Sequence, residues 1–339
     1  LYGADGANGV ILITTKGGHK GPVKFNATVQ TGVSSAINRI KYMNGEQYQE
    51  IKNHYYINSG LPENASEWNG VSTDWYDLLN RTGIFQNYNI SGSGGSDMLK
   101  LRASIGYRKI QEPQIKNSFS KYNAGIALNF SIGKVKASAK VTPSFTVKNS
   151  PNTLYSFAVP PIIPAYDSEG NYTRFDTYGN PLAGANQNRV RIETQSLLNS
   201  FNFSYDFSDD LNFSTLYGMD FSNKDQDTYY SGLNETGIDN KGNIGHRILR
   251  DRDTRRWNWN ATLQYQKQFN KKHFFDALTG VETRGNTIEF GYARGKNFPA
   301  AGKILPIEDA EVQDYEKDKT ENTGRSLFSQ LNYDYLKKY

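Results

Sequence analysis

The histidines and the paired acidic residues are the side chains best suited to chemistry, and their spacing gives them no common site. No His-x-x-x-His pair or other zinc-binding pattern occurs, and there is no Gly-x-Ser-x-Gly nucleophile elbow. The pair Asp209-Asp210 lies in a turn, where solvation explains it more simply than acid/base work. We therefore expect no catalytic residue, no metal, no cofactor and no enzyme activity. The histidines are scattered, at His19, His54, His246 and His273.

Three glycines near the start of the sequence, Gly3, Gly6 and Gly9, have a spacing that suggests a phosphate cradle. Such a cradle needs a helix N-terminus directly after it, whereas here the apolar run Val10 to Ile13 predicts a strand. We interpret these glycines as positions of positive φ and close backbone approach in a compact β-rich domain.

Aromatic residues gather in a proline-containing segment and are the candidates for ligand contact. Aromatic faces stack on sugar rings and on peptide side chains, and they carry few rotatable torsions. A loop that packs on its own aromatics is an equal alternative. The candidate substrate or partner contacts are Tyr155, Phe157, Tyr166, Tyr172, Phe175 and Tyr178, together with Trp68 and Trp75 from an earlier loop.

Two acidic turns, 167–171 and 239–243, faintly resemble calcium-binding loops. Neither contains the full series of oxygen ligands, so plain turns are favoured. A helix is expected from Gly45 to Tyr56, capped by Asn44, with an apolar stripe of Tyr48, Ile51 and Tyr55.

The elements that must position these residues are strands. After Ser120, apolar residues fall on every second position from Tyr122 to Ile132, and polar or small residues fall between them. The segment 135–148 repeats the pattern. A period of two places one kind of residue on each face of a strand, and an apolar-out, polar-in repeat of about ten residues is typical of a transmembrane β-barrel.

Short and long connections alternate along the predicted strands. Outer-membrane barrels place short turns in the periplasm and long loops outside the cell, so the first strand is expected to run outward. Tyr205, Phe207 and Phe269 precede short turns, and Trp257 and Trp259 are expected near a long loop, as in interfacial aromatic girdles. The predicted strands are 22–34, 86–93, 98–108, 120–132, 135–148, 196–207, 211–223, 254–269, 273–284 and 324–335.

Composition agrees with this interpretation. The chain has 339 residues, no cysteine and a net charge of +5, which gives no argument for nucleic acid binding. No apolar run approaches the roughly 18–20 residues of a membrane helix. The first residues carry no signal segment, and residues 337–339 fall in a turn, so we expect a longer parent protein.

The first residues also carry a specific resemblance. The run from Tyr2 to Lys16 resembles the end of the plug domain in SusC/RagA-type TonB-linked outer-membrane transporters, and it includes the plug-end residues Gly3, Gly6, Asn8 and Gly9. Further similar segments are 44–48, 73–75, 86–91, 160–172 and 331–335.

The resemblance implies an all-β fold, namely about ten strands of a 22-stranded transmembrane antiparallel barrel. Residues 1–18 would form the C-terminal end of the plug domain. Residues 19–339 would form the N-terminal part of the barrel, with long extracellular loops at 35–85, 149–195, 224–253 and 285–323.

For function, the resemblance implies TonB-dependent active import of a large nutrient, a glycan or a peptide. The implied partners are a SusD-like lipoprotein, TonB through a region N-terminal to this chain, and outer-membrane lipid. The implied location is the outer membrane of a Gram-negative, Bacteroidetes-like cell. Two alternatives remain, namely a passive porin-like barrel and a soluble all-β binding or adhesion protein.

Overall fold

The structure is a computed structural model that describes residues 16–37, 41–151, 159–174, 179–238, 242, 244–270 and 272–336. Of the sequence-based predictions, the plug-end residues Gly3, Gly6, Asn8 and Gly9 lie outside these ranges. Residues 16–18 are described, so the end of the segment assigned to the plug is only partly visible.

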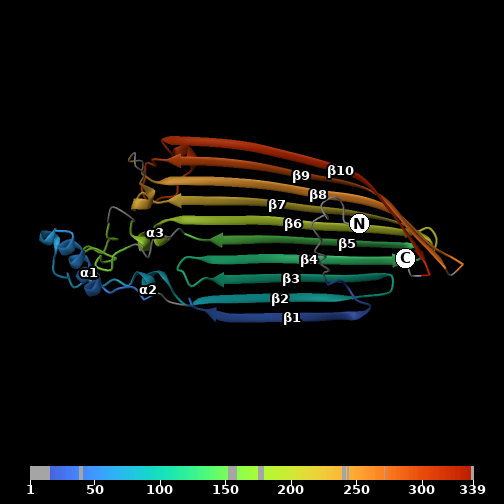
Figure 1. Ribbon diagram of the computed structural model, residues 1–339, viewed down its shortest axis with the longest axis horizontal. Coiled ribbons are helices and arrows are strands. Elements are labelled where there is room, and N and C mark those ends of the chain that lie inside the picture. Colours follow the sequence, from blue (N-terminus) through green and yellow to red (C-terminus); the bar gives the residue numbers. More distant parts are fainter. Residues whose placement is uncertain are drawn as a thin grey trace.

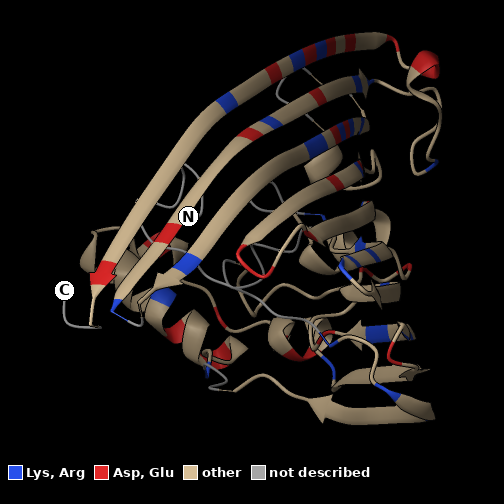
Figure 2. Ribbon diagram, turned by 90° about the vertical axis from the view of Figure 1, so that its right-hand side faces the viewer, with Lys and Arg blue, Asp and Glu red and all other residues tan. Residues whose placement is uncertain are grey.

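The described chain forms one ten-stranded antiparallel sheet in which each strand pairs with the next strand in sequence. The sheet is strongly curved (Figure 2). This architecture confirms the predicted antiparallel all-β fold. The strands are β1 (Gly21–Ser34), β2 (Gly83–Gly95), β3 (Leu99–Gln111), β4 (Ser118–Ile132), β5 (Val135–Asn149), β6 (Arg189–Asp206), β7 (Leu211–Tyr230), β8 (His246–Phe269), β9 (His273–Lys296) and β10 (Val312–Tyr335).

Short turns and longer loops alternate along the chain, as predicted, and the helices of its described part lie at the loop end of the sheet (Figure 1). In the turn between β4 and β5, Gly133 has a φ of 54°, a left-handed conformation that glycine adopts without steric cost. The helices are α1 (Gly45–Asn58), α2 (Trp75–Leu79) and α3 (Pro181–Gln187), with short 3-10 turns at Pro62–Asn64, Glu235–Gly237 and Ile307–Asp309.

The strands extend further into the loop end than predicted. For example, β8 begins at His246 and not at residue 254, and β10 begins at Val312 and not at residue 324. The predicted loops 35–85, 149–195, 224–253 and 285–323 therefore shorten to 35–82, 150–188, 231–245 and 297–311.

The physical reason is that apolar alternation marks only strand segments with one face in lipid. The loop-side parts of β8 to β10 carry closely spaced charges (Figure 2), so the apolar alternation is lost there. Trp257 and Trp259 were predicted to lie near a long loop because β8 was predicted to begin too late in the sequence. Both lie within β8, well away from the loop that precedes it.

The two faces of the sheet differ as the alternation predicted. On one face, Val29, Tyr88 and Tyr107 are direct cross-strand neighbours, and Phe25 and Val29 are 81% and 67% exposed. On the other face, Asn87 donates a hydrogen bond to Gln30 at 3.0 Å. We call the first the apolar face and the second the polar face.

The residues that precede β1 lie along the polar face. His19 Nδ1 lies 3.0 Å from Ser93 Oγ, on the polar face. A Cβ atom added to Gly17 would lie 3.3 Å from Nδ2 of Asn129, which belongs to the same face. The chain from the segment assigned to the plug thus runs along the polar face, which is the face a barrel turns toward its lumen.

Aromatic rings cluster where β6, β8, β9 and β10 meet the short turns. The centroids of Tyr205 and Phe207 lie 4.9 Å apart, those of Phe269 and Phe275 lie 5.8 Å apart, and those of Phe275 and Tyr333 lie 4.9 Å apart. Rings at this level match the girdle expected at one membrane boundary.

Among the described residues, no helix is long and apolar enough to cross a membrane.

The first prediction concerns the apolar face. Replacing Leu128 or Val141 by Arg in the full-length protein should destabilise the folded state by roughly 2–4 kcal/mol, because a cation then meets hydrocarbon. The same change at the polar-face residues Asn129 or Thr142 should cost little. A folding titration in lipid or detergent measures both, and equal tolerance on the two faces would contradict the assignment.

Candidate functional site

The loops at one end of the sheet pack into a single cap, which is the candidate functional site. Its apolar core combines residues from the first and third loops, and Ile115 of the second loop packs against it. Because these loops are distant in sequence, the core holds together segments that the strands alone would leave separate. The core residues are Trp75, Leu79, Val159, Ala165, Leu182 and Ala185.

Hydrogen bonds to the backbone of 160–163 join the first loop to the third. Thr73 donates its backbone N–H to Pro161 O at 2.8 Å and its hydroxyl to Ile163 O at 2.6 Å. Trp75 Nε1 donates to Pro160 O at 3.3 Å. Prolines at 160 and 161 fix two φ angles, so the carbonyls that accept these bonds are presented in a preformed arrangement.

A buried amide organises the third loop around the aromatic candidates. Asn180 is 2% exposed. Its side-chain oxygen accepts from the N–H groups of Leu182 and Ala183 at the start of α3, and its Nδ2 donates to Ala165 O at 2.9 Å. Each polar atom of this buried amide is thus satisfied, which ties α3 to the strand-like segment around Tyr166.

The third loop also contacts the fourth. Asn188 Oδ1 accepts from the backbone N–H of Ser231 at 3.0 Å and from Nδ2 of the buried Asn234 at 3.1 Å. Arg174 Nη2 donates to Leu233 O at 3.1 Å. The described parts of four loops therefore form one connected cap.

Tyr166 and Tyr172 form the exposed aromatic site within this cap. The two residues pair as an isolated β-bridge, and their rings stack with centroids 5.2 Å apart. Tyr172 packs against the core, whereas Tyr166 is 47% exposed. Burial, and secondarily the neighbouring Tyr166 phenol, raise the pKa of the Tyr172 hydroxyl. The exposed Tyr166 ring is thus supported from behind by Tyr172 and offers an aromatic face at the loop end of the sheet.

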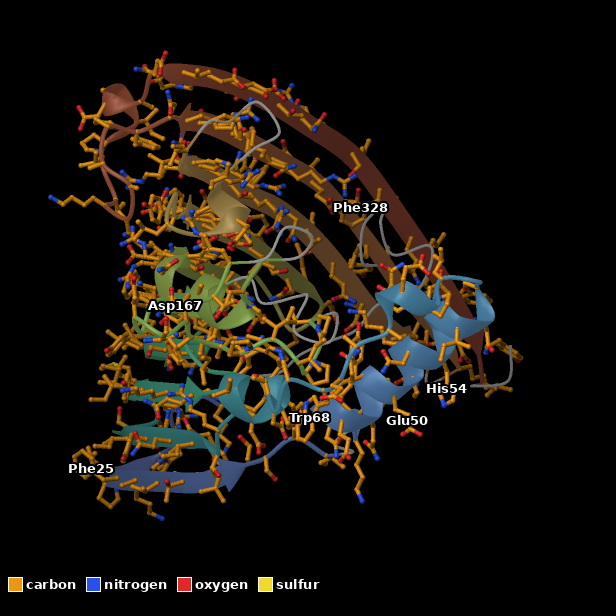
Figure 3. All side chains as sticks on the ribbon, turned by 90° about the vertical axis from the view of Figure 1, so that its left-hand side faces the viewer. Phe25, Glu50, His54, Trp68, Asp167 and Phe328 are labelled. Carbon is orange, nitrogen blue, oxygen red and sulfur yellow. The ribbon has the colours of Figure 1, made fainter. Side chains whose placement is uncertain are left out.

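The turn between these tyrosines is held by its own carboxylate. Asp167 is labelled in Figure 3. Its Oδ1 accepts from the backbone N–H groups of Glu169 and Asn171 at 2.9 Å and 2.8 Å. This arrangement is a plain acidic turn. Among the described residues, no group of three His, Cys, Asp or Glu side chains is placed to hold a metal. Most of the second acidic turn, 239–243, lies outside the described residues.

The other predicted contact residues have different roles or lie outside the described ranges. Trp75 is 5% exposed and belongs to the core that joins the first and third loops. Trp68 is 39% exposed and donates through Nε1 to Val71 O at 2.8 Å. Tyr155, Phe157, Phe175 and Tyr178 lie outside the described residues.

Helix α1 exposes apolar residues that the sequence predicted as its stripe. The helix and its Asn44 cap are confirmed, with Asn44 and Gln47 forming a capping box. Its buried contacts are polar, however, because Gln49 Nε2 donates to Ser66 Oγ at 3.0 Å. Ile51 and Tyr55 are 55% and 65% exposed. We call Tyr48, Ile51 and Tyr55 the α1 stripe.

A curved antiparallel sheet with one apolar face, one polar face and the long loops of its described part at one end has the architecture of a section of a transmembrane β-barrel wall. A solved structure of the RagAB peptide transporter is similar to this chain, with a TM-score of 0.80 and 20% sequence identity. The alignment covers 99% of this chain and 43% of the transporter chain. The RagAB peptide importer in its closed-closed state matches with a TM-score of 0.78 and 19% identity over the same shares.

Curated relatives agree with the solved structures. TonB-dependent receptor P26 of Formosa agariphila is 26% identical over the whole chain, and TonB-dependent receptor SusC of Bacteroides thetaiotaomicron is 24% identical over the whole chain. The chain spans 36% of the length of each of these relatives. No protein-family model matches it. The chain thus resembles SusC/RagA-type TonB-dependent receptors over its entire length, as its sequence motifs predicted.

Proposed function

We propose that this chain is part of a transporter that imports a large nutrient, a glycan or a peptide, across the outer membrane of a Gram-negative, Bacteroidetes-like cell with energy supplied through TonB. The observation that carries the proposal is the receptor-type wall, which matches SusC-named and TonB-dependent relatives along the whole chain. In this transporter, the described strands would form part of the barrel wall, and the cap would form part of its extracellular mouth.

The exposed apolar residues support a membrane location. Ile90, Ile105 and Ile126 are 52%, 61% and 50% exposed and lie on the apolar face of three neighbouring strands, β2 to β4. A soluble protein rarely leaves so much contiguous apolar surface in water, so this face disfavours the alternative of a soluble binding or adhesion protein. Lipid is the natural solvent for it.

Two features of the cap support capture of cargo beneath a partner. The Tyr166 ring offers a supported aromatic face that suits either a sugar ring or a peptide side chain. The α1 stripe offers an exposed apolar surface on a helix held by polar contacts. We propose that Tyr166 and Tyr172 contact cargo and that a SusD-like lipoprotein covers the α1 stripe.

The second prediction tests cargo capture. Changing Tyr166 and Tyr172 together to Ala in the full-length protein should weaken cargo binding by roughly 1–4 kcal/mol, because the stacked aromatic face is lost. Changing both to Phe keeps the rings and should preserve binding. Uptake of the nutrient and growth on it are the measurements, at equal surface expression.

Two results of this experiment would count against the proposal. Wild-type uptake by the Ala double variant would show that the two rings only pack on each other. Uptake that persists in a strain without TonB would favour the alternative of a passive porin-like barrel.

The third prediction tests the partner surface separately. Changing Ile51 and Tyr55 together to Ala should weaken association with the lipoprotein by at least about 1 kcal/mol, because exposed apolar anchors are removed. The control is Glu50→Ala with His54→Ala, an exposed polar pair one turn apart on the same helix (Figure 3), whose loss removes no apolar side chain. Co-purification of the lipoprotein is the measurement. Equal loss in both variants, or loss in neither, would remove the α1 stripe from the interface.

A further inference from the structure

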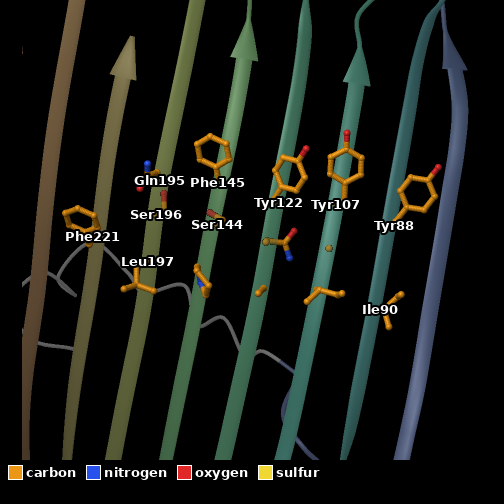
Figure 4. Close-up of a pocket in the computed structure, with 15 residues that line it drawn as sticks. Tyr88, Ile90, Tyr107, Tyr122, Ser144, Phe145, Gln195, Ser196, Leu197 and Phe221 are labelled. Carbon is orange, nitrogen blue, oxygen red and sulfur yellow. The ribbon is translucent and has the colours of Figure 1, made fainter. Parts of the chain in front are cut away.

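A row of aromatic rings crosses four neighbouring strands on the apolar face. Tyr88, Tyr107, Tyr122 and Phe145 are direct cross-strand partners in sequence from β2 to β5. Their successive ring centroids are 6.3, 4.8 and 6.4 Å apart. The three tyrosine hydroxyls point toward the loop end of the strands (Figure 4).

A groove of about 960 Å³ opens beneath this row, on the side of the short turns. Small residues at its centre leave it open, since Ala124 stands opposite Ile105 and Pro143 stands opposite Leu197. The strand pairing is also interrupted there, between the pairs Asn123/Ser144 and Ile126/Val141. The groove is lined mainly by apolar atoms and extends across the sheet from Ile90 to Phe221 (Figure 4).

The height of the row places the groove in the outer leaflet. Tyr122 and Ile132 are ten residues apart on β4, which corresponds to ~33 Å along a strand. For a strand tilted by about 40°, this length spans a height of roughly 25 Å, which is the height of the apolar band of an outer-membrane barrel. With Ile132 beside a short turn, the tyrosine row lies at the opposite boundary, where Tyr is favoured.

We propose that this groove binds one acyl chain of lipid A, the membrane anchor of lipopolysaccharide in the outer leaflet. The inference rests on the outer-membrane location proposed above and goes beyond import. The groove is continuous with the lipid-facing surface, so its occupant comes from the bilayer. A volume near the upper end of the usual range for ligand pockets, about 300–1,000 Å³, accommodates a long chain.

The rim supplies chemistry for a phosphorylated head group. Lys109 lies two residues beyond Tyr107 on the same face and toward the loops, and its cross-strand neighbours Gln86 and Ser120 are uncharged. Because acyl chains are as apolar as the groove, burial alone gives no preference for one lipid. Selectivity instead comes from the fit to the hollow, the phenol hydroxyls and the Lys109 charge.

The test uses the full-length protein purified from outer membranes in mild detergent, with bound lipid A and phospholipid quantified by mass spectrometry. Ala124→Phe fills the hollow and should lower retained lipid A by about tenfold, equivalent to the loss of one good packing or hydrogen-bonding contact. Ala103→Phe is the matched control, because Ala103 lies on the same face but outside the groove. It should retain lipid A at the wild-type level.

A second variant keeps the groove open and removes only the rim chemistry. Tyr107→Phe with Lys109→Gln should also lower retained lipid A, and this variant decides the matter if Ala124→Phe does not fold. Heat-modifiable migration on gels reports folding, and nutrient uptake reports import separately. Equal lipid A in the wild type and in the folded variants would overturn the proposal, as would retention of phospholipid in place of lipid A.

Discussion

The pairing of backbone N–H and C=O groups between neighbouring strands is the constraint on which this structure depends. Hydrocarbon offers no hydrogen-bond partner, so a chain that crosses it must satisfy these groups within the protein. Pairing each strand with its neighbour in sequence meets this requirement with the shortest connections. Once the strands are paired in this way, side chains must alternate between lipid and lumen, and loops must gather at the two ends.

The cap depends on the same arrangement. Antiparallel pairing brings the first and third loops to one end of the wall, where Trp75 and Leu79 pack against Val159 and Leu182. Hydrogen bonds from Thr73 to the carbonyls of Pro161 and Ile163 then set how the loops lie. The sheet thus gathers the loops at one end. The contacts between the loops then hold Tyr166 and the α1 stripe where their side chains are exposed.

Much of the fold was predictable because one physical signal, alternation with a period of two, extends through β4 and β5. The prediction failed where that signal ends. The first residues of β8, beginning at His246, are rich in charge and carry no apolar alternation, so the sequence there resembles a loop. The Asn44 cap of α1 was predictable because capping depends on neighbouring residues alone.

The candidate site was predictable only in part. Aromatic composition pointed to Tyr166 and Trp75 equally, but their roles depend on contacts between distant loops that no local pattern records. Trp75 fills the core, and Tyr166 faces out. The groove beneath Tyr122 was missed for a similar reason, since it arises from the cross-strand register of Ala124 and Pro143 with larger neighbours.

The central claim is that this wall crosses the outer membrane with its long loops outside, and cysteine labelling tests it most directly. The chain contains no cysteine, and Ser168 and Asp209 are both exposed, one in the third loop and one in a short turn. In the full-length protein on intact cells, an impermeant maleimide should label Ser168→Cys and leave Asp209→Cys unlabelled until the cells are opened. Labelling of Asp209→Cys on intact cells, with Ser168→Cys protected, would contradict the account.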